Sequence, residues 1–216
     1  MELVLNEDQE LIAKTALDFV NEHSPVSRFR ALRDSGEELG YSRALFKEMA
    51  ELGWAGIPFD EKQGGAGMGF AELVLIVEAL GRKLAPEPFL GGVTMGGCAL
   101  ALGGDGALRD AWLPGVIDAS KVVALAHQEP RSRYDLFAIE TVAEASGDTY
   151  RLTGEKTQVL DAVGADALAI SSFELPGGAN WTIEILLTGP VDRAAWEVRL
   201  RRAAAGLDMA PPRLTL

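Results

Sequence analysis

The sequence predicts an α+β protein, in which an α-helical bundle precedes a β-domain. In the first 118 residues, apolar side chains recur every three or four positions, which is the spacing of one buried helix face. After Ser120 the apolar residues fall in short β-rich runs that are separated by clusters of turn-forming residues. We therefore predict an α-helical domain over 1–118 and a β-domain over 119–216, whose antiparallel strands form a small barrel or sandwich.

Capping residues and prolines predict where the first helices begin and end. Asn6 and Gln9 have the spacing of a capping box, and Pro25 is expected to end the helix that they start. Ser42 is expected to cap a second helix, and Gly53 to adopt the left-handed conformation after its last turn. The beginnings of two helices are thus predicted from local sequence.

The remaining elements are predicted from periodicity. Helices are expected over 70–84, over the small apolar segment 91–102, and over 105–112, where Pro114 closes the last one. Strands are expected within 121–126, 136–145, 149–159, 165–173, 181–189 and 214–216, with turns at 146–148 and 176–180.

Charge and composition exclude several classes of function. The formal net charge is −12, from 32 acidic and 20 basic side chains, so the field of the whole chain repels nucleic acid and anionic lipid. The run Arg199–Arg202 is locally basic and is either a solvated edge or a site for a phosphorylated small molecule. One cysteine, Cys98, and two histidines do not make a disulfide or a Cys/His metal cluster. With an acidic N-terminus that is unlike a signal peptide, we expect a soluble cytoplasmic protein that binds neither nucleic acid nor membranes.

Three ordered motifs resemble the acyl-CoA dehydrogenase family. The stretch 53–82, "GWAGIPFDEKQGGAGMGFAELVLIVEALGR", resembles the "P…GG.G" loop and long helix of the N-terminal domain of that family. The stretch 126–135, "AHQEPRSRYD", falls where the family has a "TEP..GSD" loop, and 147–172 is similar to its "GD.Y.LNG.K.WITN…AD" segment. The resemblance covers essentially the whole chain.

The resemblance implies FAD as cofactor, with its ring held by the β-domain. By position in the motifs, His127 and Gln128 are expected at the pyrimidine edge, and Gln158, Val159 and Leu160 along the ring. Backbone donors survive any substitution except proline, so this part of a flavin cradle can persist. Gln128 replaces the family's Thr and can still donate, whereas Gln158 replaces its Trp and Leu160 its hydroxyl residue, which removes a stacking surface and a donor.

The resemblance also implies an acyl-CoA substrate and an electron-transfer flavoprotein as acceptor. Tyr134 stands where the family's serine contacts the pantetheine arm. Arg131 and Arg133 either bind CoA phosphates or only solubilise a turn, and Met95 is expected to line the acyl end of the pocket.

The remaining polar residues of these motifs are expected to have structural roles. Glu129, Pro130 and Asp135 are expected to fix the loop rather than to transfer protons. His127 either titrates near neutrality or is simply packed, and Lys156 is expected to be a structural charge.

Desaturation in this family requires a Glu from a C-terminal helical domain, and no residue is assigned to that catalytic role in the present sequence. Three interpretations follow: a fragment of a longer acyl-CoA dehydrogenase, a short subunit that lends half of a flavin site to a partner, or a non-catalytic binding module of a heteromeric enzyme. The intact protein is expected to be a dimer, a tetramer or a heteromer. The 216 residues alone are expected to be inactive, to bind FAD poorly or not at all, and to self-associate.

Overall fold

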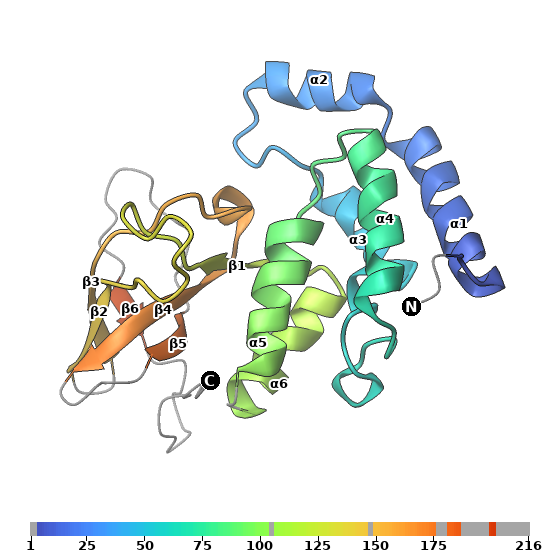
Figure 1. Cartoon of the computed structure of the whole chain (residues 1–216). Helices are drawn as coiled ribbons and strands as arrows, with labels where there is room; N and C mark the ends of the chain where they lie inside the picture. Colours follow the sequence, from blue (N-terminus) through green and yellow to red (C-terminus); the bar gives the residue numbers. More distant parts are fainter. Residues whose placement is uncertain (1–3, 104–105, 147–148, 176–180, 187–198, 202–216) are drawn as a thin grey trace. The chain divides into compact units, whose positions relative to one another are not determined.

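The computed structural model describes residues 4–103, 106–146, 149–175, 181–186 and 199–201 (Figure 1). Helices precede strands along the chain, as predicted for an α+β protein. The α-helices are α1 (Glu7–His23), α2 (Val26–Ser35), α3 (Arg43–Glu51), α4 (Phe70–Arg82), α5 (Cys98–Leu102) and α6 (Gly106–Ile117). The strands are β1 (Val123–Ala126), β2 (Val142–Ser146), β3 (Thr149–Thr153), β4 (Ala167–Leu175), β5 (Trp181–Leu186) and β6 (Arg199–Arg201).

Spatial proximity divides the chain into two compact units. The first comprises residues 1–90 and 117–120, and the second comprises 91–116 and 121–216. The segment that contains α5 and α6 therefore groups with the strands rather than with the first four helices.

The predicted caps of α1 and α3 are confirmed. The Gln9 amide donates to Asn6 Oδ1 at 2.8 Å, and the Asn6 amide donates to Gln9 Oε1 at 3.2 Å. The Leu45 amide donates to the Ser42 hydroxyl at 3.2 Å, and Gly53 has φ = 83° after α3. These contacts satisfy amide groups that a helix leaves unpaired at its first turn, so they need no tertiary partner.

Helix α2 was not predicted from the sequence. Pro25 was expected only to end the preceding helix, but it also precedes the first residue of α2. None of the residues of α2 is buried, so the helix has no apolar stripe to be recognised in the sequence. Its Arg28 pairs with the fully buried Glu87 at 2.5 Å and donates to the Ser24 hydroxyl at 3.0 Å. A tertiary ion pair thus holds a helix whose own sequence signal is weak.

The expected end of the last helix at Pro114 was wrong. Helix α6 continues through Pro114 to Ile117, although proline removes one helical hydrogen bond. Burial of Leu113 and Val116, each only 1% exposed, stabilises the turn around the proline.

The segment that precedes α5 is a π-helix over Phe89–Gly97. At Gly96 a Cβ atom would overlap the backbone carbonyl of Val123. This close approach explains why a residue without a Cβ atom is required at Gly96.

The β-sheet is mixed, which corrects the expectation of a purely antiparallel domain. The hairpin pairs β2–β3 and β4–β5 are antiparallel, but β4 pairs in parallel with β1 over Ala167–Ile170 and with β2 over Phe173–Leu175. Strand β5 lies along one edge of β4. Strands β1 and β2 therefore lie one after the other along the opposite edge. Strand β6 adds to β3 in antiparallel orientation. A closed barrel is not formed by the described strands, whose order is β1-β4-β2-β3-β6 with β5 on β4.

Long-range pairing explains this difference. A short turn forces neighbouring strands to run antiparallel, whereas a long connection leaves the direction open. The segments 136–141 and 154–159, predicted to be strand, lie instead in the connections between strands. The predicted turn residues 147–148 and 176–180, the end of the predicted strand at 187–189, Arg202, and the expected strand at 214–216 lie outside the described residues.

The core of the sheet is a cluster of small and branched apolar residues. Its buried members are Ala124, Ala126, Ala143, Leu168 and Ile170. In the described part of the chain, none of the helices has both the length and the apolar character needed to cross a membrane.

Candidate functional site

The predicted flavin residues lie on two segments of the second unit, each of which leaves the end of a strand. The first segment, residues 127–130, follows β1, and the second, residues 156–160, follows β3. The Thr157 amide donates to the Gln128 carbonyl at 2.8 Å. The two segments are therefore joined through their backbones.

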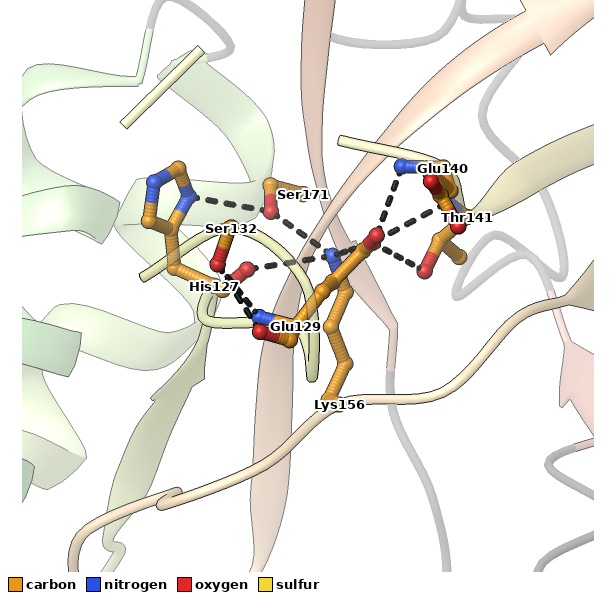
Figure 2. Close-up of polar contacts among 7 residues, drawn as sticks. All are labelled: His127, Glu129, Ser132, Glu140, Thr141, Lys156 and Ser171. Atoms are coloured by element: carbon orange, nitrogen blue, oxygen red, sulfur yellow. Dashed lines mark hydrogen bonds and ion pairs between the residues drawn. The ribbon is translucent and has the colours of Figure 1, made fainter. Parts of the chain in front are cut away.

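Glu129 is the main acceptor between these segments (Figure 2). Its Oε1 accepts from the Thr141 amide at 3.0 Å, the Thr141 hydroxyl at 2.6 Å and Lys156 Nζ at 2.7 Å. Its Oε2 accepts from the Glu140 amide at 2.6 Å. Both ends of the 129–141 loop are tied to one buried carboxylate, as expected for a loop-fixing role.

Lys156 is the main donor of the same network. Its Nζ donates to Glu129, to the Ser171 hydroxyl on β4 at 3.0 Å and to the His127 carbonyl at 3.3 Å. The side chains of Lys156 and Glu129 are only 8% and 4% exposed. The expected structural role of Lys156 agrees with these contacts.

The pKa shifts show how burial and pairing compete. Burial opposes ionisation of Glu129, but the hydrogen bonds from Lys156, Thr141 and the Glu140 and Thr141 amides outweigh it and lower the pKa of Glu129. Burial lowers the pKa of Lys156, while the hydrogen bond and the charge of Glu129 oppose that shift. A buried ion pair between charged partners is consistent with these directions.

His127 points toward β4. Its Nδ1 lies 3.0 Å from the Ser171 hydroxyl, as Figure 2 shows. Burial and the charge of Lys156 lower the pKa of His127, and a hydrogen bond with the Leu136 backbone and the charge of Glu129 oppose this shift. These contacts favour a packed, neutral imidazole.

Gln128 and the segment 158–160 present unpaired donors. Within the described ranges, no partner is found for the Gln128 amide N–H, for the Gln128 side chain or for the amides of Gln158, Val159 and Leu160. Gln128 is half-buried, whereas the Val159 side chain packs against the sheet core and leaves only its backbone for a ligand. Gln158 has φ = 52°, a left-handed backbone conformation.

These residues fit the polar edge of a flavin better than its ring face. A row of backbone N–H groups and one amide side chain is suited to carbonyl and nitrogen acceptors of the kind found on the pyrimidine ring. Gln158 provides no aromatic surface for stacking, and Leu160 provides no side-chain donor. The residues would therefore hold FAD chiefly through backbone hydrogen bonds.

The predicted substrate residues occupy the exposed part of the loop. Arg131 pairs with Glu140 at 2.8 Å, and Arg133 has φ = 44°. Tyr134 is 97% exposed. Asp135 Oδ1 accepts from the Phe137 amide at 2.9 Å, which is the predicted contact back to the turn. Arg131 and Tyr134 lie on one loop that is accessible to a ligand.

Met95 lies apart from this loop in sequence, on the π-helix Phe89–Gly97. Its side chain is half-buried. The same helix is linked to the end of the segment 156–160 by the next residue, Asp161, whose Oδ2 accepts from the Gly91 and Gly92 amides at 2.8 and 3.1 Å. Burial raises the pKa of Asp161, and the two amide hydrogen bonds oppose this shift.

Sequence reasoning did not identify three residues of this network. Thr141 lies outside the three motifs, and Ser171, although it stands within the motif 147–172, has no sequence feature that distinguishes it from its neighbour Ser172. Asp161 directly follows the predicted ring segment and is a short polar residue with φ = 59°, so its position beside Leu160 was the available signal.

Comparison with protein families identifies the N-terminal part of the chain. A family model described as "Acyl-CoA dehydrogenase, N-terminal domain" matches residues 6–120, more than half of the chain. Mitochondrial isovaleryl-CoA dehydrogenase of Bos taurus is 29% identical over 168 residues, covering 77% of this chain and 39% of that protein. Mitochondrial isobutyryl-CoA dehydrogenase of Dictyostelium discoideum is 31% identical over 153 residues, covering 70% and 36%. The chain thus spans roughly two fifths of the length of these relatives.

Solved structures extend the similarity through the strands. A variant of the Tcur3481-Tcur3483 steroid ACAD is 30% identical with a TM-score of 0.72, covering 84% of this chain and 48% of that chain. Acyl-CoA dehydrogenase from Geobacillus kaustophilus is 20% identical with a TM-score of 0.73, covering 94% and 58%, which is a likeness of fold. With the matched family model, these similarities show that the chain belongs to the acyl-CoA dehydrogenase family.

Proposed function

We propose that this chain forms the flavin-binding and thioester-binding side of an FAD-dependent acyl-CoA dehydrogenase. The observation that carries the proposal is the pair of segments 127–130 and 156–160, which are bonded to each other and each of which contains amide donors without a partner among the described residues. Donors that are fixed before a ligand binds need no reorganisation when they bind it.

The proposed reaction is oxidation of an acyl-CoA thioester at Cα–Cβ, in which a proton leaves Cα and a hydride leaves Cβ. The chemistry that FAD supplies when bound is acceptance of the hydride. The Gln128 amides and the backbone of 158–160 would orient the pyrimidine edge, while the buried Glu129–Lys156 pair keeps their segments in place. Proton removal also requires a carboxylate base, and we propose that a partner or a further segment supplies it.

A second candidate is a subunit that binds but does not oxidise. The replacement of aromatic and hydroxyl residues by Gln158 and Leu160 favours this alternative, because both changes remove contacts with the ring. The 30% identical structure is named with two components, Tcur3481 and Tcur3483, which supports a heteromeric assembly.

The proposed partners follow from the same reaction. Electrons would leave through a flavoprotein acceptor of the electron-transfer type, and the chain would act as a homo-oligomer or with a second subunit. The expected compartment is the cytoplasm. The 216 residues alone are proposed to bind FAD weakly and to lack dehydrogenase activity, because the assigned contacts reach one edge of the ring.

The two candidates are separated by assaying a panel of CoA thioesters with an artificial electron acceptor. The assay uses the protein purified with its natural partners and loaded with FAD. Turnover with one thioester class supports the dehydrogenase. Stoichiometric FAD without turnover of any thioester supports the binding subunit, and failure of the purified protein to retain FAD contradicts both.

The substrate role of Arg131 and Arg133 is tested with the double substitution Arg131→Gln and Arg133→Gln. Loss of guanidinium contacts to CoA phosphates should raise KM for a CoA thioester about tenfold, or about 1.4 kcal/mol. KM for the matching N-acetylcysteamine thioester, which has no phosphate, should stay unchanged. Arg33→Gln, on exposed α2, is the control. An equal effect on both thioesters would contradict phosphate binding.

A further inference from the structure

We propose that Lys156 is a positioning residue that sets the affinity for FAD by holding the two donor segments in register. This inference rests on the proposed function, because the segments are the ones assigned to the flavin edge. Lys156 lies on the second segment, and Figure 2 shows its ammonium group bonded to Glu129, to Ser171 and to the main chain of His127.

The contacts of Lys156 fix three different parts of the second unit. The three protons of its ammonium group match three acceptors: the His127 carbonyl, Glu129 Oε1 and the Ser171 hydroxyl. His127 and Glu129 flank Gln128 on both sides, so Lys156 holds the residues before and after the half-buried donor. Ser171 belongs to β4, which pairs with β1 and β5 in the sheet. Lys156 therefore links both donor segments to the sheet, beside the contact of His127 with the same serine.

A backbone contact alone is not enough for this role. The Thr157 amide donates to the Gln128 carbonyl at 2.8 Å, and the Glu129 amide, in the same peptide plane, donates to the Ser132 hydroxyl at 3.0 Å. The Gln128 N–H lies in the preceding peptide plane, whose His127 carbonyl accepts from Lys156, so Lys156 restricts the direction of this N–H. A misplacement of about 1 Å is enough to weaken a set of aligned donors.

Lys156 and its partner are both buried, so a substitution of Lys156 affects folding as well as the position of the two segments. The side chain is 8% exposed, and its neighbour Glu129 is 4% exposed. Removal of the ammonium alone leaves a buried carboxylate without its cation, which destabilises the fold as a whole. A test must therefore separate loss of folding from loss of positioning.

The test compares Lys156→Met with the double variant Lys156→Met, Glu129→Gln. The double variant removes both charges. The side-chain carbonyl introduced by Glu129→Gln still accepts from the Thr141 amide, whereas its NH2 group cannot accept from the Glu140 amide, so the melting temperature should recover most of the loss seen in Lys156→Met. Lys14→Met is the control, because Lys14 is 77% exposed and pairs with Asp18 on the same helix. The measurements are melting temperature, amide hydrogen exchange of 127–129 and 156–160, and FAD affinity by flavin fluorescence.

In the double variant, we expect FAD affinity to stay at least tenfold below that of the wild type although the melting temperature recovers. Exchange of the hydrogen-bonded amides of Glu129 and Thr157, one in each segment, should increase together at least tenfold, and Lys14→Met should change neither quantity. Recovery of FAD affinity in parallel with melting temperature would overturn the positioning role and leave the proposed function intact. If saturating FAD slows exchange of neither segment in the wild type, the flavin site itself is wrong and the inference fails with it.

Discussion

Two ion pairs involve residues of the loop 127–141, and they differ mainly in burial. Glu129 and Lys156 are almost fully buried and share their hydrogen bonds with Thr141 and Ser171. Arg131 and Glu140 are 81% and 60% exposed. Exposed pairs contribute about 0–1 kcal/mol, so Arg131 is free to exchange Glu140 for a ligand phosphate, whereas Glu129 is not free to move.

At the same scale, Asp161 is expected to make stability depend on pH. Its folded pKa is raised, so the stability that it contributes is present below its unfolded pKa of about 3.9 and is lost as the pH rises through the folded pKa. Asp161→Asn keeps an acceptor for the Gly91 and Gly92 amides and tolerates φ = 59°. We expect the variant to be more stable at pH 7 by roughly 1 kcal/mol.

Thermal unfolding between pH 4 and 8 measures this effect, because the lower limit lies near the unfolded pKa of about 3.9. The advantage of Asp161→Asn should shrink as the pH falls toward the lower limit. Asp166, whose carboxylate accepts from the Val122 amide at 2.8 Å, is the matched control, and Asp166→Asn should give no such gain. A constant difference across the range would contradict the proposed cause.

At the scale of elements, the helices of this chain depend on different interactions. Helix α1 begins at a complete capping box, and α3 begins at Ser42, so both starts are encoded locally. Helix α2 has no buried residue and is held through Arg28 and Glu87. The π-helix Phe89–Gly97 depends on close approach to the backbone of β1.

The close approach predicts opposite effects for two glycine substitutions. Gly96→Ala places a methyl group against the Val123 carbonyl, and we expect it to lower the free energy of unfolding by about 1–3 kcal/mol. Gly81→Ala lies in α4, where nothing is within 4 Å of the new atom, and should stabilise the protein by about 0.5–1 kcal/mol. Urea titration of both variants checks the signs. If Gly96→Ala left the free energy of unfolding unchanged, β1 would have moved away from the new methyl group without cost, and the prediction would be wrong.

At the scale of the whole molecule, large apolar side chains remain exposed on several elements. Phe70 and Val74 are 58% and 57% exposed and lie four residues apart on one face of α4. Neighbouring exposed apolar side chains favour association. Figure 1 shows α1 beside α4, and Leu11 of α1 is also 64% exposed.

We therefore expect the 216-residue chain to self-associate. The double substitution Phe70→Gln and Val74→Gln should shift the population toward the monomer, because it removes the adjacent apolar pair. Light scattering coupled to size-exclusion chromatography over a range of concentrations measures this shift. Leu102→Gln, which changes one side chain that is 77% exposed, is the control and should have a smaller effect. A wild-type chain that is monomeric throughout would refute the prediction.

Local sequence by itself determined the features that depend on neighbouring residues. The caps at Asn6 and Ser42, the left-handed Gly53 and the antiparallel direction of both hairpins follow from contacts within a few residues. The motif at 126–135 likewise predicted a loop fixed by Glu129, since the acid and its loop are adjacent. The family resemblance came from the same kind of ordered local motifs.

Tertiary structure alone decided the features that depend on distant residues. The parallel pairing of β4 with β1 and β2, the passage of α6 through Pro114 and the existence of α2 are all set by burial or by ion pairs between separate segments. The same holds for Lys156, which meets Ser171 and the His127 carbonyl only after the sheet has formed. Local preferences are worth a fraction of a kcal/mol per residue, whereas a buried contact is worth about 1–3 kcal/mol, so the distant contact prevails where the two disagree.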